Sequence, residues 1–152
     1  MEFFRSRLDP PRRLLFSTLR RHSKPGAGTF QRAQAQAWLS YLSSTLHVAL
    51  SAALFPMDGC DNDTANTTAL DRAIKVFAGF DQHLAGRDHL LDRFSACDLY
   101  LLVFVLWRAA PGFADRLPAF ANLDRFQQNL LAGRPNLAMM VGEEMRLRSE
   151  AG

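Results

Sequence analysis

Three of the four histidines are the first candidates for chemistry in this chain, because an imidazole can bind a metal or move a proton near neutral pH. His83 and His89 flank the segment Leu84-Ala85-Gly86-Arg87, and His47 lies in a long, mostly apolar segment. None of them has the spacing of a metal site such as His-Glu-x-x-His, and no cysteine or carboxylate completes a ligand set beside them. We therefore expect no metal site, and we interpret His83 and His89 as loop or surface residues.

The two cysteines offer no second motif. Cys60 lies in a polar loop and Cys97 in the first turn of an apolar segment. They form neither a Cys-x-x-Cys pair nor a disulfide framework. This usage favours a reducing, intracellular setting, and we expect the protein to be cytoplasmic.

A serine and an acid three residues apart, Ser95 and Asp98, precede the apolar run Leu99–Trp107. This spacing predicts a capping box, with Asp where Glu or Gln is usual, in which each side chain accepts from the other residue's backbone N–H. Phe94 and Leu99 stand at the positions of a hydrophobic staple. A helix that is apolar all round lies in a membrane or in a bundle, and nine apolar residues are far fewer than the roughly 20 that a bilayer needs. The capped helix is therefore predicted to lie at the centre of a soluble bundle, with Ser95 and Asp98 as its structural cap.

Apolar residues at helical spacing, bounded by Pro and Gly, predict the elements that surround this helix. No segment alternates with period two, and no repeat of 20 to 50 residues is present. The charged pairs Asp124-Arg125 and Glu143-Glu144 are interpreted as solvated helix faces. The prediction is an all-α bundle of about five helices, which run over residues 29–55, 66–84, 95–110, 118–131 and 135–148, the last with Pro135 in its first turn.

Composition and charge limit the classes of protein to which the chain can belong. The 152 residues suit one domain with a real core, and 48% hydrophobic with 22% charged residues is ordinary for a globular protein. The net charge of +3 is uneven, because residues 1–24 carry seven Lys or Arg against two acids, whereas the rest is slightly acidic. This basic head has no long apolar core, so we expect neither secretion nor membrane insertion, and a flexible arm beside a neutral body argues against nucleic-acid binding.

Five short segments resemble one known family, the cytosolic glutathione transferases, in their C-terminal helical domain and most closely in the bacterial beta-like type. The resemblance covers about residues 29–148. It divides the chain into a basic segment, 1–28, and a helical domain, 29–152. The segments are Gln31-Arg32-Ala33-Gln34, Trp38-Leu39-Ser40-Tyr41-Leu42 with Leu46-His47, Leu84-Ala85-Gly86-Arg87, Phe94 to Tyr100, and Arg134-Pro135 with Glu143-Glu144.

The resemblance implies a bundle that accompanies a thioredoxin-like domain of roughly 80 residues, which supplies the glutathione site and the catalytic residue. Only about 28 residues precede the match here, so we expect that domain to be missing from this chain. No catalytic residue is then assigned, and no cofactor is expected on this chain alone. Glutathione would be a co-substrate only if a thioredoxin-like half is supplied.

The same resemblance implies a hydrophobic-substrate site. His47 takes the place of a cleft-facing family histidine, although the family lysine after it is Val48 here. Trp107 matches an aromatic residue of the substrate pocket, and Tyr41 and Ser44 precede His47 by about a turn. For each residue, core packing or plain solvent exposure stays open as the alternative.

Two functions remain open at this point: the substrate half of a glutathione-conjugating enzyme that is inactive alone, or a non-enzymatic interaction and dimerisation module of the same fold. A truncated gene product is a third possibility. We expect a homodimer or a thioredoxin-like partner chain, because part of the bundle should expose apolar surface. The residues expected nearest that surface are Trp38, Tyr41, Leu42, His47 and Trp107.

Overall fold

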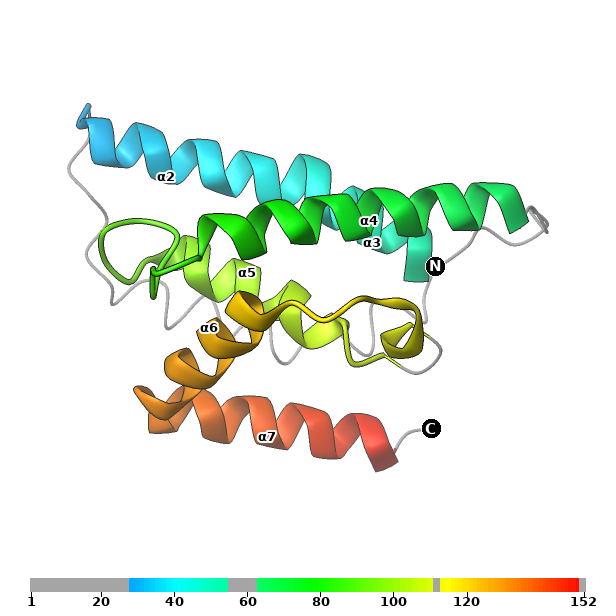
Figure 1. Cartoon of the computed structure of the whole chain (residues 1–152). Helices are drawn as coiled ribbons and strands as arrows, with labels where there is room; N and C mark the ends of the chain where they lie inside the picture. Colours follow the sequence, from blue (N-terminus) through cyan, green and yellow to red (C-terminus); the bar gives the residue numbers. More distant parts are fainter. Residues whose placement is uncertain (1–27, 55–62, 111–112, 151–152) are drawn as a thin grey trace.

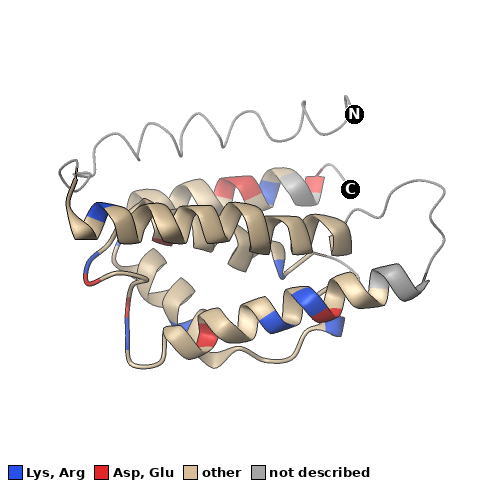
Figure 2. Ribbon diagram, turned by 90° about the horizontal axis from the view of Figure 1, so that it is seen from above, with Lys and Arg blue, Asp and Glu red and all other residues tan. Residues whose placement is uncertain are grey.

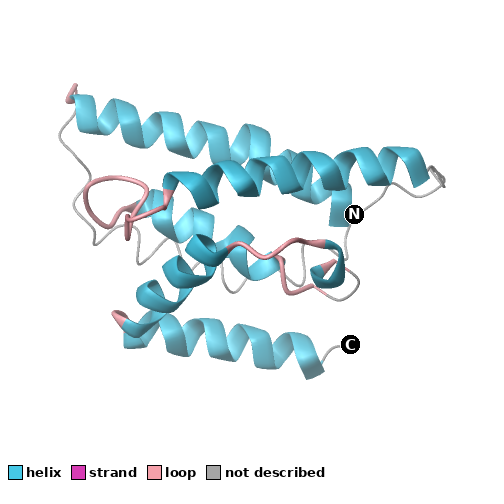
Figure 3. Ribbon diagram, viewed as in Figure 1, coloured by secondary structure: helices cyan, strands magenta, loops and turns pink. Residues whose placement is uncertain are grey.

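The computed structural model describes residues 28–54, 63–110 and 113–150, and these fold as a helical bundle (Figure 1). No strand occurs in the described ranges, as Figure 3 shows. Since α2, η1 and α3 follow one another without a break, five long helices result, and the predicted all-α bundle is confirmed. The elements are α2 (Phe30–Tyr41), the π-helical η1 (Leu42–Leu46), α3 (His47–Leu54), α4 (Asp63–His83), α5 (Ala96–Trp107), the 3₁₀ turn η2 (Ala114–Arg116), α6 (Ala121–Ala132) and α7 (Pro135–Glu150).

Two helix starts show how local sequence and tertiary contacts divide the work of capping. The hydroxyl of Thr29 accepts from the backbone N–H of Arg32 and begins α2 where it was predicted. Helix α6 begins three residues later than predicted and has no side-chain cap of its own. Instead Asp81, on α4, accepts from the backbone N–H groups of Asn122 at 2.8 Å and Leu123 at 2.9 Å. A carboxylate distant in sequence therefore satisfies the free donors at the start of α6.

The first long helix contains a π turn that the sequence pattern did not indicate. The backbone N–H of His47 donates to the carbonyl of Leu42, five residues earlier. The hydroxyls of Ser43 and Ser44 both donate to the carbonyl of Ser40, at 3.0 and 2.7 Å. Single π turns inside α-helices often occur at functional sites, and this one ends immediately before His47.

Helix α5 lies at the centre of the bundle, below α2 and α4 and next to α6 in Figure 1. Seven of its twelve residues are buried. Phe104 on α5, Phe77 and Phe80 on α4, and Phe126 on α6 are the largest fully buried side chains. Burial of each of these side chains stabilises the fold by about 1.5 to 3 kcal/mol. Because most residues of α5 are buried, the core is built mainly around this helix.

Some sequence predictions fall outside the described residues: the basic head, 1–27, and Cys60. Among the residues expected at an apolar surface, Tyr41 is 42% exposed, and Trp38, His47 and Trp107 are half-buried. Leu42 was placed wrongly, since it is fully buried. It belongs to η1, which packs against α4 and α5.

Candidate functional site

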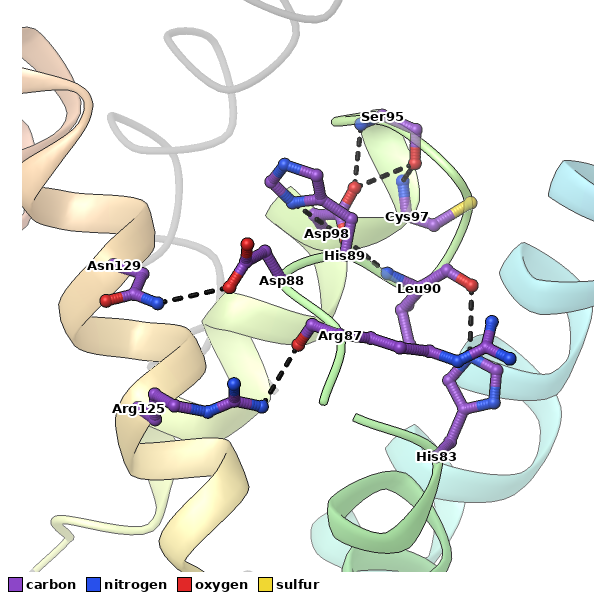
Figure 4. A network of polar contacts seen from close by, with 10 residues as sticks. All are labelled: His83, Arg87, Asp88, His89, Leu90, Ser95, Cys97, Asp98, Arg125 and Asn129. Carbon is purple, nitrogen blue, oxygen red and sulfur yellow. Dashed lines mark hydrogen bonds and ion pairs between the residues drawn. The ribbon is translucent and has the colours of Figure 1, made fainter. Parts of the chain in front are cut away.

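The first turn of α5 takes part in a network of polar contacts (Figure 4). The Asp98 carboxylate is fully buried and accepts from the backbone N–H of Ser95 at 2.7 Å and from the Ser95 hydroxyl at 3.0 Å. The Ser95 hydroxyl in turn accepts from the backbone of Cys97 at 3.2 Å, and both halves of a capping box are present. The predicted structural cap is confirmed.

Asp98 also accepts a hydrogen bond that the capping pattern did not predict. Its second oxygen accepts from the backbone N–H of Leu90 at 2.8 Å, eight residues earlier. One carboxylate therefore ties the start of α5 to the middle of the preceding loop, residues 84–95.

Two basic residues of the C-terminal part hold the same loop from the outside. Arg125 donates to the backbone carbonyls of Leu84 and of Arg87, the latter at 3.1 Å. The guanidinium of Arg134 lies 3.6 Å from the centre of the Phe94 ring. The interpretation of Asp124-Arg125 as a solvated face holds for Asp124, which is 53% exposed and pairs with Arg108, but is wrong for Arg125.

The two histidines of the loop are half-buried rather than simple surface residues. The ring of His83 lies 4.7 Å from Trp38, between centroids, and its Nε2 is 3.0 Å from the carbonyl of Leu90. The Nδ1 of His89 lies 4.0 Å from an oxygen of Asp98 and makes no hydrogen bond. Both side chains help to pack the loop.

Burial controls the ionisation of this region. It raises the pKa of Asp98, against the opposing effect of the hydrogen bonds from Leu90 and Ser95. Burial also raises the pKa of the Cys97 thiol, which donates to the carbonyl of Ala35 at 3.4 Å. A thiol that stays protonated is a poor nucleophile, so nothing in this network favours covalent chemistry.

A second cluster lies further along α5 and is largely aromatic. The ring of His47 is 5.5 Å from Phe104 and 5.9 Å from Trp107, between centroids. Its Nδ1 is 3.5 Å from the hydroxyl of Tyr100, whose ring stacks on Phe104 at 4.9 Å. Phe104 is buried, whereas the other three are half-buried. We refer to His47, Tyr100, Phe104 and Trp107 as the aromatic cluster.

The structure therefore brings together two of the four predicted substrate-site residues, His47 and Trp107. The other two contact different groups. Tyr41 packs on Phe80, with 5.6 Å between ring centroids, and Ser44 is exposed with its hydroxyl bonded to the backbone.

Of the comparisons with known proteins, the one with solved structures found matches. No family model and no curated protein matches the chain. Three glutathione S-transferase structures match with a TM-score of 0.67: one from Sphingomonas chungbukensis, of the bacterial beta class, at 26% identity, one from a sphingomonad, complexed with glutathione, at 29%, and the bacterial BphK, in a ternary complex, at 25%. Each alignment covers 79% of this chain and 57% of the other. The chain therefore has the fold of the C-terminal helical domain of these glutathione S-transferases.

In this glutathione S-transferase-like bundle, sequence analysis missed Tyr100 and Phe104. Their signal was present, because Tyr100, Phe104 and Trp107 are separated by four and three residues and must share one side of a helix. The π turn then places His47 beside that side. The described residues contain no group of three or more His, Cys, Asp or Glu that could hold a metal ion. None of the described helices is long and apolar enough to cross a membrane.

Proposed function

We propose that this chain forms the hydrophobic-substrate half of a glutathione-conjugating enzyme and is inactive until a thioredoxin-like half supplies glutathione. The aromatic cluster is the observation that carries the proposal. Its indole and imidazole rings offer flat apolar surface to an electrophile, and the Tyr100 hydroxyl and His47 nitrogen offer polar contacts beside it. Among the similar structures, the sphingomonad enzyme is complexed with glutathione and BphK is in a ternary complex.

The division of labour explains why the chain should be inactive alone. Conjugation needs a glutathione thiolate, which forms when a hydrogen bond or a positive charge lowers the thiol pKa. The aromatic cluster presents no Lys or Arg, and Val48 follows His47. The chain spans 57% of the length of the similar structures. In this proposal, the thioredoxin-like half or chain contributes the activating groups, and the complex is cytoplasmic.

A binding experiment on the full chain tests the substrate role without requiring turnover. The probe is S-(2,4-dinitrophenyl)glutathione, whose flat nitroaromatic group quenches nearby tryptophan. We expect quenching of the wild type and about tenfold weaker binding for His47→Ala, a loss of about 1.4 kcal/mol. The matched control is Val48→Ala, which changes the neighbouring, 52% exposed side chain.

The outcomes separate the parts of the proposal. Equal binding by both variants, or no quenching at all, would remove the aromatic cluster as a substrate site. Conjugation of 1-chloro-2,4-dinitrobenzene with glutathione above background would show instead that the chain needs no second half.

One surface favours the alternative, a non-enzymatic interaction and dimerisation module. From Ala33 to Leu54 the helix formed by α2, η1 and α3 has no Lys, Arg, Asp or Glu, and in Figure 2 this helix is tan except near its start. It nevertheless exposes Tyr41 and Val48. Depletion of charge with exposed aromatic side chains is typical of protein interfaces. Light scattering tests it: Tyr41→Glu should convert a dimer to a monomer, and a wild-type monomer at tens of micromolar would contradict it.

A further inference from the structure

His89 has a buried ring nitrogen that makes no hydrogen bond. Its Nδ1 lies 4.0 Å from Oδ1 of Asp98, which is too far for a hydrogen bond, and the described residues supply no other partner. Figure 4 shows the imidazole beside the carboxylate at the start of α5. Since buried polar atoms in folded proteins nearly always have a partner, this gap calls for an explanation.

The Asp98 carboxylate has an acceptor position left on the oxygen nearest His89. A carboxylate can accept about four hydrogen bonds, two at each oxygen. Oδ2 accepts two, from the backbone N–H and the hydroxyl of Ser95, whereas Oδ1 accepts one, from the backbone N–H of Leu90. Because these three described partners are all donors, a further proton at this carboxyl group fits on Oδ1, the oxygen that faces Nδ1.

The protonation state of the imidazole decides how strongly it can use that position. A neutral imidazole has one N–H for its two nitrogens, so the side chain, which is 24% exposed, can place the proton towards water instead of towards Asp98. An imidazolium has an N–H on both nitrogens, and its bond to a carboxylate is charge-assisted. Protonation therefore favours a shorter contact between Nδ1 and Oδ1.

Other charges around His89 act more weakly, because Asp98 is the only charged side chain that is buried among the described residues. The four charged residues of the loop are exposed, where solvent and salt screen them. The titratable and charged groups that surround His89 are Arg87, Asp88, Asp92 and Arg93 from its own loop, His83 from α4, Cys97 and Asp98 from α5, Arg125 from α6 and Arg134 from α7.

The contact bears directly on the loop, residues 84–95, because the next residue, Leu90, is held at both of its backbone groups. Its N–H donates to Oδ1 of Asp98 at 2.8 Å, and its carbonyl lies 3.0 Å from Nε2 of His83. Its side chain is buried. A movement of His89 towards Oδ1 thus tightens the same connection between the loop and α5 that Leu90 makes.

We propose that His89 and Asp98 form a proton-controlled clasp, in which uptake of one proton by the pair closes the gap between Nδ1 and Oδ1 and ties the loop to α5. The closed clasp binds this proton more tightly than the open loop, so it is favoured at low pH and weakens as the pH rises. Burial raises the pKa of Asp98, and the bonds from Leu90 and Ser95 and the charge of His89 oppose that rise, so the two groups titrate as a pair. The clasp does not depend on the proposed function.

Amide hydrogen exchange of the full chain, followed by NMR, tests the clasp. The probe is the protection factor of the Leu90 amide, which corrects for the intrinsic effect of pH on exchange. Between about pH 5 and about pH 8, where imidazoles ordinarily titrate, we expect it to fall about fivefold to tenfold. The control is the Leu123 amide, which donates to the carboxylate of Asp81 at 2.9 Å and should keep its protection.

Two variants assign the effect to one histidine. His89→Gln keeps a polar side chain that does not titrate, and it should remove the pH dependence at Leu90. His83→Gln, the matched control, keeps a donor for the carbonyl of Leu90, and it should leave the pH dependence in place.

Several results would overturn the proposal. They are constant protection of Leu90 in the wild type, an equal change at Leu123, a pH dependence that persists in His89→Gln, or one that disappears in His83→Gln. If circular dichroism shows that His89→Gln does not fold, the ring nitrogens of the wild type are observed by ¹H–¹⁵N NMR. A slowly exchanging proton at Nδ1 of His89 is expected at about pH 5, and its absence would equally rule out the clasp.

Discussion

The start of α5 and its aromatic cluster are held by different kinds of contact. At its start, the Asp98 carboxylate makes three hydrogen bonds of 2.7 to 3.0 Å, and each has a defined direction. Further along the helix, His47 and Tyr100 share a polar contact of 3.5 Å, and the ring of His47 packs against those of Phe104 and Trp107. Directional bonds specify one geometry, whereas ring contacts tolerate small displacements. The start of α5 is thus suited to fixing the fold, and the aromatic cluster is the part to which the proposed function assigns a ligand.

The largest expected effect is at the start of α5. Asp98→Ala leaves the buried N–H groups of Leu90 and Ser95 without an acceptor, and we expect a loss of about 2 to 5 kcal/mol in the free energy of unfolding. Ser95→Ala should cost about 0.5 to 2 kcal/mol, and the double variant less than the sum, since the two side chains share one motif. Urea denaturation measures all three. A midpoint for Asp98→Ala equal to that of wild type would refute the comparison.

The next effect concerns the contacts that hold the loop from outside. Arg125→Met keeps the length of the side chain but removes its bonds to the carbonyls of Leu84 and Arg87. Bonds to a charged group contribute about 1.5 to 3 kcal/mol, and we expect a loss near the lower end because Arg125 is half-buried. The control is Arg93→Met, at an exposed position of the same loop, which should change the midpoint little.

The pH dependence of stability separates the effect of charge from that of shape. Because burial raises the pKa of Asp98 above its usual 3.8, the folded chain binds this proton more tightly than the unfolded chain. The contribution of Asp98 is then complete below about pH 4 and is lost as the pH rises through the raised pKa. Relative to Asp98→Asn, which does not titrate, wild type should lose stability over that range in urea titrations at successive pH values. A relative gain with rising pH would mean that the hydrogen bonds outweigh burial.

The smallest expected effect lies at the aromatic end. Tyr100→Phe removes the long contact with His47, and we expect a loss of less than about 1 kcal/mol in stability. If the cluster binds a ligand, the same variant should weaken dinitrophenyl glutathione binding more clearly than it lowers the unfolding midpoint. A large stability loss with unchanged binding would assign Tyr100 to the fold instead.

The sequence predicted what depends on neighbouring residues. Ser95 and Asp98 form their cap within four residues, and the helical spacing of apolar side chains was enough for the five helices. The bonds of Asp98 to Leu90 and of Arg125 to Leu84 and Arg87 were not predictable, because tertiary folding alone brings these groups together. The expectation that Tyr41 and Ser44 accompany His47 assumed a regular α-helix, and the π turn between them made it unreliable.

That π turn has a consequence for how the molecule could be altered. A turn closed by a bond across five residues contains one residue more than an α-helical turn, so η1 acts as a one-residue insertion absorbed within a helix. Deleting Ser43 should therefore remove the extra residue and let a regular α-helix form, while the residues beyond it keep nearly the same orientation. His47 would stay beside Tyr100, and Ser95 and Asp98, on another helix, would keep their cap. The π turn thus marks the place in this helix where the loss of one residue should be tolerated best.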